Sequence, residues 1–201
     1  MRMQALVLLL LTAVSVVWAG PVTLMFDDVI TSSAVPMPSG YGGLNWENMR
    51  VVRGEFVPDS GYERGVVSAS NVAANPQGNP AAFSLASGTF DLTGFHATAA
   101  WSEGLEATFT GFLGAVQVYQ HNVLLSTLSP ALIELNWSGI NRVEFSGTGG
   151  VDDPGDGGTG PHIVLDNLRF ADLPVSQVPE AGTVWLLGAG LIGLLWRRRP
   201  V

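Results

Sequence analysis

The sequence contains no cysteine and no lysine among its 201 residues. The absence of cysteine excludes disulfide bonds, iron–sulfur clusters and thiol nucleophiles, and the absence of lysine excludes Schiff-base catalysis. Charged residues are also scarce, at 13% of the chain, whereas hydrophobic residues make up 47%. Because the apolar excess lies at the two ends, the residues between them resemble one ordinary soluble domain in composition and length.

The first 19 residues predict a secretory signal peptide. Arg2 supplies a short positive region, and the run from Ala5 to Val17 is apolar. A run of about 13 residues is shorter than the ~20 needed to span a membrane, so a signal peptide is favoured over an anchor helix. Val17 and Ala19 lie where small residues precede a cleavage site, so we expect cleavage between Ala19 and Gly20 and export of the mature chain.

The central part of the chain is strongly acidic. Between Gly20 and Val178 there are 16 acidic residues and five arginines, a formal charge of −11. This charge argues against a nucleic-acid partner. Divalent cations are natural counter-ions for such a surface, although solubility alone also explains the value.

The tail combines a short apolar stretch with a basic end. Residues 181–196 carry no charge, and as a helix they measure about 24 Å against a hydrocarbon core of ~30 Å. Arg197, Arg198 and Arg199 follow and are expected to stay in the cytoplasm. The sequence therefore predicts a linker at 173–178 and a transmembrane helix at 181–196.

The order of features in the tail resembles the PEP-CTERM sorting signal: Val178, Pro179 and Glu180 come first, then the Gly-rich apolar stretch, then the arginine cluster. The resemblance covers residues 178–201 and implies a Gram-negative bacterium that makes extracellular polysaccharide. It also implies two partners, the secretion machinery and an exosortase that processes the chain at 178–180. The helix and the arginines would then form a transient inner-membrane anchor for a protein destined for the outer surface or extracellular matrix. Ala181 stands where a second proline is usual, and a plain tail anchor is the alternative.

Residues 20–172 show the pattern of an all-β domain. Short β-branched and aromatic segments alternate with turn residues, and no helical period is sustained. The pattern predicts a single antiparallel β-sandwich, jelly-roll-like, between the signal peptide and the C-terminal helix. The expected strands are 22–26, 50–57, 65–70, 89–101, 105–113, 115–125, 131–137, 141–146 and 163–170.

The segments F-D-D at 26–28 and I-V-L-D-N-L-R-F at 163–170 are similar to the terminal strands of galactose-binding-like jelly rolls, the fold of many carbohydrate-binding modules. The resemblance implies that the first and last strands lie side by side near a structural calcium. Asp27, Asp28 and Asp166 are then its candidate ligands.

Asp166 has the strand parity of Val164, Leu168 and Phe170, so we expect it on the apolar side of its strand. A carboxylate in such a place needs a cation or several hydrogen-bond donors. Apart from calcium, the alternative is therefore a structural aspartate that is hydrogen-bonded and holds no metal.

A second acidic cluster, Asp152, Asp153 and Asp156, lies in a Gly-rich segment. It lacks the alternating ligands and the terminal Glu of an EF-hand loop. We therefore expect a solvated, mobile loop.

The segment from Ser39 to Met49 has the residues that a sugar-binding loop needs, an aromatic platform flanked by polar side chains. The candidate ligand-binding residues are Tyr41, Asn45, Trp46 and Asn48. Glu47 lies in the same segment and adds a carboxylate. In the alternative interpretation Trp46 closes one end of the sandwich, as Trp101 and Trp137 would.

Catalytic motifs are missing. The chain has no G-x-S-x-G and no H-E-x-x-H, and its histidines (His96, His121 and His162) lack metal-ligand spacing. Glu103 and Glu106 could form a glycosidase pair, but their separation in space does not follow from the sequence. We predict a non-catalytic surface or matrix protein that binds carbohydrate or another surface component. The alternative is a polysaccharide-modifying enzyme on the same scaffold.

Overall fold

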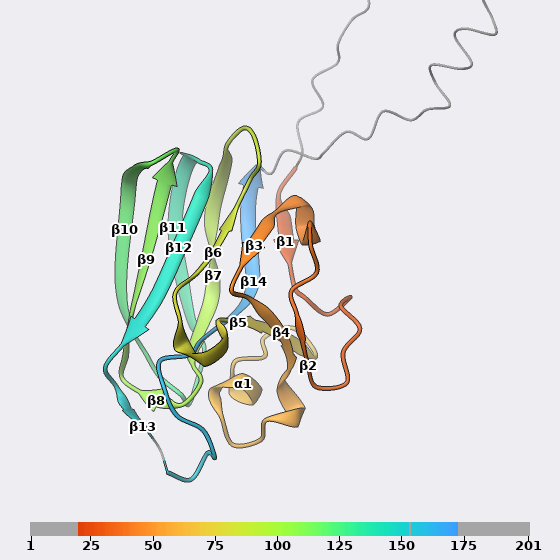
Figure 1. The fold of residues 1–201 in the computed structure, drawn as a ribbon, viewed down its shortest axis with the longest axis vertical. Coiled ribbons are helices and arrows are strands. Elements are labelled where there is room, and N and C mark those ends of the chain that lie inside the picture. Colours follow the sequence, from red (N-terminus) through yellow and green to blue (C-terminus); the bar gives the residue numbers. More distant parts are fainter. Residues whose placement is uncertain (1–19, 153, 173–201) are drawn as a thin grey trace, which may run out of the picture.

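Two antiparallel sheets face each other in the computed structural model, which describes residues 20–152 and 154–172 (Figure 1). The larger sheet has seven strands in the order β11-β7-β14-β5-β4-β2, with β1 paired to β14. The smaller sheet has five, in the order β10-β9-β12-β6-β3, and β13 pairs with β8 separately. The predicted fold class, an antiparallel β-sandwich, is confirmed.

The larger sheet comprises β1 (Val22–Leu24), β2 (Ala34–Pro36), β4 (Arg50–Arg53), β5 (Asn71–Ala74), β7 (Phe90–Ala99), β11 (Ala131–Ile140) and β14 (Ile163–Asp172). The smaller sheet comprises β3 (Asn45–Glu47), β6 (Ala81–Ser84), β9 (Leu105–Leu113), β10 (Val116–Leu125) and β12 (Arg142–Thr148). The separate pair is β8 (Ser102–Glu103) and β13 (Val151–Asp152). The helical segments are short: η1 (Tyr41–Gly43), η2 (Gly54–Phe56), α1 (Gly61–Arg64) and η3 (Pro76–Gly78).

Alternating apolar residues bring the two sheets together. In β9, Leu105, Ala107 and Phe109 are buried, while the residues between them are less buried or exposed. Phe109 meets Phe95 of β7, from the opposite sheet, with ring centroids 4.7 Å apart. Each such side chain contributes about 1.5–3 kcal/mol when fully buried. The main apolar cluster lies entirely between Leu24 and Phe170, so residues 20–172 contain their own core.

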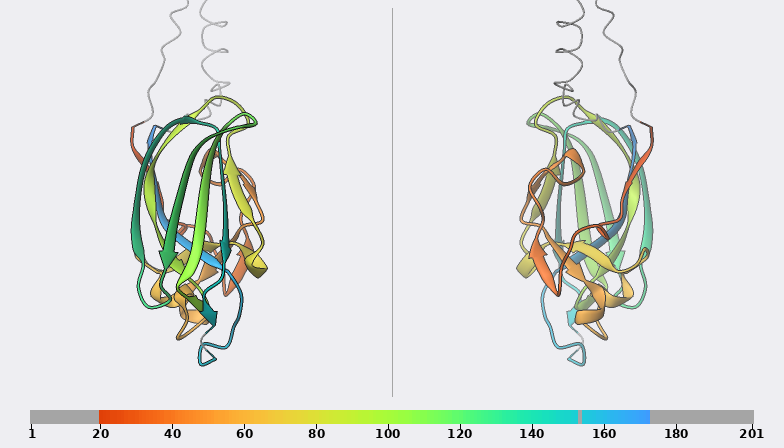
Figure 2. Two further views of the ribbon diagram at one scale, coloured as in Figure 1. Left: turned by 90° about the vertical axis from the view of Figure 1, so that its left-hand side faces the viewer. Right: turned by 90° about the vertical axis from the view of Figure 1, so that its right-hand side faces the viewer.

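The first and last strands lie side by side, as the jelly-roll resemblance implies. Val22 of β1 is opposite Phe170 of β14, and Leu24 is opposite Leu168. Because the pairing is antiparallel, the described chain begins and ends at the same end of the sandwich (Figures 1 and 2). The loop between β13 and β14 and the helix α1 lie at the other end (Figure 1).

A β-bulge in β14 changes the position of Asp166. The residues of β14 that face the main core are Ile163, Leu165, Leu168 and Phe170. The alternation therefore slips by one residue, at Asn167, which has a φ of 50°, and the register against β7 shifts between Asp166 and Arg169. The expectation that Asp166 shares a face with Leu168 and Phe170 was wrong, because periodicity does not reveal a bulge. Asp166 lies on the outer face of the larger sheet, with Val164.

Two other strand predictions need correction. Residues 65–70 form a loop after α1, and the strand is the next segment, β5. The predicted strand 50–57 ends at Arg53 because η2 follows directly. The short strands β2, β3, β6, β8 and β13 were not predicted, since two to four residues are too few to show alternation.

The predicted signal peptide (1–19), linker (173–178) and transmembrane helix (181–196) lie outside the described residues. Among the residues that the structure does describe, no helix has both the length and the apolar character needed to cross a membrane.

Candidate functional site

A hollow of about 500 Å³ opens between the strands β2 to β4 and the turn η3. We call it the Trp46 groove. It is lined by Pro36, Met37, Trp46, Asn48, Met49, Arg50, Pro76 and Gln77. The lining combines an aromatic ring and two methionines with two amides and a guanidinium, and it includes no carboxylate.

Trp46 contributes to both the core and the groove. It lies on β3, and its indole Nε1–H donates to the carbonyl oxygen of Tyr41 at 2.9 Å. Its ring packs against Phe83 and Phe26, with centroids 5.5 and 6.2 Å away. The side chain is only partly buried. One part packs against the core, as the structural interpretation of Trp46 expects, and the rest lines the groove, as the sugar-binding interpretation expects.

Two exposed amides line the groove, Asn48 from the β3–β4 turn and Gln77 from η3. Both have positive φ, 52° and 58°. This conformation is common for Asn but strained for Gln, and such strain is found preferentially at functional sites. The Nδ2 of Asn48 donates to the carbonyl oxygens of Asn79 and Pro80, at 3.1 and 3.0 Å, which fixes the amide beside the η3 turn.

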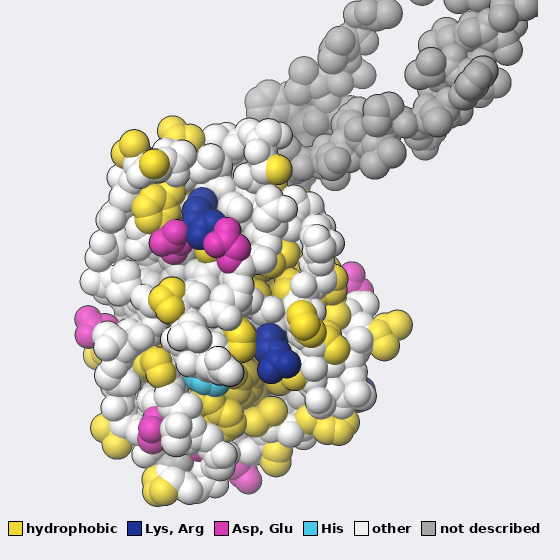
Figure 3. All heavy atoms as spheres, viewed as in Figure 1, with side chains coloured by type: hydrophobic (Ala, Val, Ile, Leu, Met, Phe, Trp, Pro, Cys, Tyr) yellow, Lys and Arg dark blue, Asp and Glu magenta, His cyan; other side chains and the backbone are white. Residues whose placement is uncertain are grey.

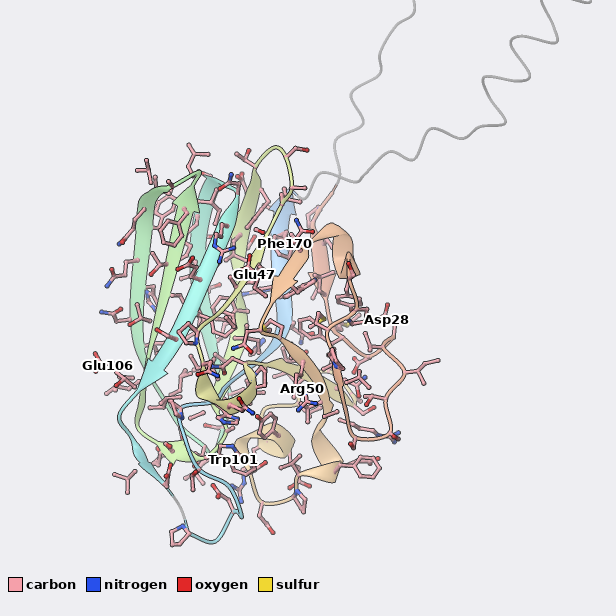
Figure 4. The ribbon with its side chains drawn as sticks, viewed as in Figure 1. Asp28, Glu47, Arg50, Trp101, Glu106 and Phe170 are labelled. Carbon is pink, nitrogen blue, oxygen red and sulfur yellow. The ribbon has the colours of Figure 1, made fainter. Side chains whose placement is uncertain are left out.

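Arg50 begins β4, and its exposed side chain lines the groove (Figure 4). Its charge acts on Tyr62, whose hydroxyl donates to or accepts from His162 Nδ1 at 2.8 Å. Burial raises the pKa of Tyr62, and the nearby guanidinium of Arg50 opposes that rise. Burial also lowers the pKa of His162, so this pair is neutral at pH 7.

The other predicted ligand-binding residues lie elsewhere. Tyr41 lines a second hollow of about 450 Å³ with Asp27 and Asp28, and its hydroxyl donates to Asp28 Oδ1 at 2.7 Å. Burial, followed by this hydrogen bond, raises the pKa of Tyr41. Asn45 is exposed and lines neither hollow. Glu47 is held by Arg142, whose hydrogen bonds lower the pKa of its carboxyl group. The structure thus brings only Trp46 and Asn48 of this set to the groove.

The tail of the chain supplies the family evidence. Residues 177–199 match the PEP-CTERM protein-sorting motif. The PEP-CTERM resemblance predicted from Val178, Pro179, Glu180 and the arginine cluster is confirmed, and this motif indicates an exported protein that an exosortase processes for the cell surface. The motif covers only this end of the chain. No curated protein matches the sequence.

Solved structures with a similar arrangement include two carbohydrate-binding modules. TmCBM61, in complex with β-1,4-galactotriose, is 12% identical and has a TM-score of 0.38, over 67% of this chain and 94% of that one. The CBM51 of Clostridium perfringens GH95, in complex with methyl-galactose, is 11% identical, with a TM-score of 0.34 over 74% and 99%. A DUF4465 family protein from Bacteroides ovatus is 9% identical, with a TM-score of 0.40 over 76% and 94%. At this level of similarity no function is transferred from them to this chain.

The three predicted calcium ligands do not form one site. Both carboxylate oxygens of Asp166 accept hydrogen bonds from protein donors: Val67 N–H at 2.7 Å, Ser68 N–H at 2.9 Å, Asn167 N–H at 2.6 Å and the Ser68 hydroxyl at 3.1 Å. Asp27 accepts from Asn71 N–H at 2.9 Å, and Asp28 from Tyr41. In the described ranges no three His, Asp or Glu side chains are grouped so as to hold a metal. These residues do not fit the implied calcium.

The acidic loop is attached to the sandwich. Asp152 accepts hydrogen bonds from the Ser102 hydroxyl and from Gly160 N–H, and Asp156 is largely buried and accepts from Gly158 N–H at 3.1 Å. Asp153 lies outside the described residues. The expectation of a solvated loop was therefore wrong for Asp156, whose carboxylate is largely buried and has a backbone donor, whereas Asp152 is exposed.

The predicted carboxylate pair lies away from the groove. Glu103 accepts hydrogen bonds from Ser126 and from the N–H and hydroxyl of Thr127, and the backbone bond lowers the pKa of its carboxyl group most. Glu106 is exposed on β9, at the opposite edge of the view from Asp28 (Figure 4). Neither residue lines the Trp46 groove or the second hollow.

Sequence reasoning missed Arg50 and Gln77. Arg50 was assigned only to the start of a strand, and Gln77 lies in a Pro-Gln-Gly turn that was not considered as a site. The letters P-Q-G indicate a turn in the sequence. The contact of this turn with the β3–β4 turn, about 30 positions away in the chain, depends on the pairing of β3 with β6 and is not visible locally.

Proposed function

We propose that this protein is a non-catalytic, exported surface protein that binds carbohydrate through the Trp46 groove. The PEP-CTERM motif supports export and delivery to the surface. The observation that carries the binding proposal is the composition of the groove, in which Trp46 and the methionines supply an apolar floor and Asn48, Gln77 and Arg50 supply polar groups.

This combination suits a sugar because a pyranose ring has apolar C–H faces and polar edges. An aromatic ring offers an apolar surface to one face, while amides and a guanidinium hydrogen-bond the hydroxyl groups. The lack of a carboxylate in the lining favours binding over glycosidic hydrolysis, which needs two carboxyl groups beside the scissile bond.

The proposal extends to processing and destination. The signal peptide is cleaved between Ala19 and Gly20, and residues 181–196 with the following arginines hold the chain transiently in the inner membrane. An exosortase then acts at Val178, Pro179 and Glu180, and the domain is released to the outer surface or extracellular polysaccharide. The PEP-CTERM motif supports this route, with Ala181 replacing the second proline of the motif.

Glycan retention by the fragment 20–178, which contains the whole main core, tests the binding proposal. Gln77→Gly removes a groove side chain and also tolerates the positive φ, so it should leave the melting temperature unchanged. We expect it to weaken binding about 5- to 10-fold, the value of roughly one hydrogen bond. Gln120→Ala, at an exposed position on β10, is the matched control.

Equal retention by wild type and Gln77→Gly would contradict a role for the groove. Polysaccharide turnover by the wild-type fragment that Glu106→Gln abolishes would replace the binding proposal with the enzymatic alternative.

A further inference from the structure

Arg50 differs from most of the other arginines of the domain because no acidic side chain in the described part of the chain pairs with it. Three of the five described arginines have such a partner: Arg53 with Glu55 at 2.6 Å, Arg64 with Asp59 at 3.8 Å, and Arg142 with Glu47 and Glu144. Arg169 has no acidic partner among the described side chains either, but two of its guanidinium nitrogens are buried. Among the arginines that the structure describes, Arg50 alone is exposed and has neither an ion pair nor a side-chain hydrogen bond with a described residue.

This isolation is unusual for the charge of the chain. Acidic residues outnumber arginines 16 to five between Gly20 and Val178. Figure 3 shows two basic side chains on one face of the domain. The upper one is flanked by two acidic side chains and lies where Figure 4 labels Glu47, the partner of Arg142. The lower one lies where Figure 4 labels Arg50, and it is surrounded by hydrophobic and uncharged atoms. The groove around Arg50 is therefore free of the acidic charge that dominates the chain.

We infer that the Trp46 groove binds an acidic saccharide, with the carboxylate of a uronic acid paired to Arg50. The guanidinium is a planar fork whose two parallel N–H bonds match the geometry of a carboxylate. In the same groove Trp46 contacts the sugar ring, and Asn48 and Gln77 hydrogen-bond its hydroxyl groups. The inference rests on the proposed function and adds the class of ligand.

The acidic surface also acts on the orientation of such a ligand. A polyanion is repelled by most of a domain with a formal charge of −11, and the repulsion is least where an unpaired cation lies in a groove without carboxylates. Both effects contribute to specificity, because the acidic surface disfavours binding of the polyanion elsewhere on the domain and Arg50 stabilises its binding in the groove.

The experiment compares polymers that differ only in charge. Polygalacturonate, alginate and hyaluronate are each presented to the fragment 20–178 beside their methyl esters, in 150 mM salt. We expect wild type to bind at least one acid form about tenfold more tightly than its ester, since a charge-assisted pair is lost in the ester. Arg50→Gln should abolish this preference, and Arg50→Lys should restore part of it, because lysine keeps the charge without the fork.

Arg64→Gln is the control, because it changes the net charge equally, removes an arginine that already has a partner and lies outside the groove lining. It should keep the preference. The side chain of Arg50 is exposed, so Arg50→Gln should melt at the wild-type temperature. Equal binding of acid and ester, or a preference that survives Arg50→Gln, would overturn the inference and leave carbohydrate binding intact. If the fragment retains neutral glycans alone, the inference fails in the same way; if it retains no glycan, the proposed function fails as well.

Discussion

Asp166→Asn should destabilise the domain although the two side chains have nearly the same shape. The carboxylate of Asp166 is almost completely buried and accepts bonds through both oxygens. Val67 and Ser68 N–H donate to one oxygen, and Asn167 N–H and the Ser68 hydroxyl donate to the other. An asparagine replaces one oxygen with an NH₂ group, which cannot accept. In the better orientation the NH₂ group faces the Ser68 hydroxyl, which can rotate to accept, and Asn167 N–H loses its acceptor.

The magnitude follows from this count. One buried donor without a partner costs about 1–3 kcal/mol, and the two bonds that remain lose the contribution of a charged acceptor, together about 1 kcal/mol. Burial opposes this contribution, because it raises the pKa of Asp166 and so disfavours the carboxylate. We therefore expect a loss of about 2–3 kcal/mol in the free energy of unfolding for Asn and a larger loss for Ala, which leaves three backbone donors unpaired.

Urea unfolding of the fragment 20–178 measures these losses. Hydrogen exchange locates them, at the amide of Asn167 for Asn and also at the amides of Val67 and Ser68 for Ala. Asp59→Asn is the matched control, since that side chain is 81% exposed and its change should stay within 0.5 kcal/mol. A loss below 1 kcal/mol for Asp166→Asn would refute the reasoning. A stabilisation by calcium that Asp166→Asn abolishes would instead reinstate the metal that the geometry does not support.

Two other predictions concern the end of the sandwich near α1. Gly61→Ala should destabilise the fragment by about 2–4 kcal/mol in urea unfolding, because a Cβ at Gly61 would overlap the carbonyl oxygen of Ala99; wild-type stability would show that α1 moves freely away from β7. The free energy of unfolding should also fall in acid because of His162, whose pKa is lowered by burial from its ordinary value of 6.5. The folded state then binds a proton less readily than the unfolded state, so stability is complete above pH 6.5 and is lost as the pH falls through the lowered value. His162→Gln should flatten this slope, and an unchanged slope would contradict the explanation.

The long strands could be predicted because each repeats its apolar alternation several times. β9 was predicted with its observed bounds, Leu105–Leu113, and β10 and β14 begin within one residue of the expected start. The strand predictions that were wrong depend on a single residue or on the pairing of strands that are distant in the sequence. Asn167 alone displaces the alternation of β14, and no local pattern marks it before the pairing with β7 is known.

The site was predicted in part for the same reason. Trp46 and Asn48 belong to one aromatic and amide-rich segment, so composition was sufficient to select them. Arg50 and Gln77 became candidates only when the sheet brought β4 and η3 to the same hollow. Tyr41 shares the segment, but its hydroxyl binds Asp28 and its ring lines the other hollow.

The position of β14 determines how the domain responds to mechanical tension. The strand is flanked on both sides, by β7 along most of its length and by β5 and β1 on the other side. A pull on the chain beyond Asp172 acts along this strand, so the ladder bonds on both sides share the force in shear and do not open one after another. A pull from the C-terminal side is thus resisted by a strand that pairs with three others, β7, β5 and β1.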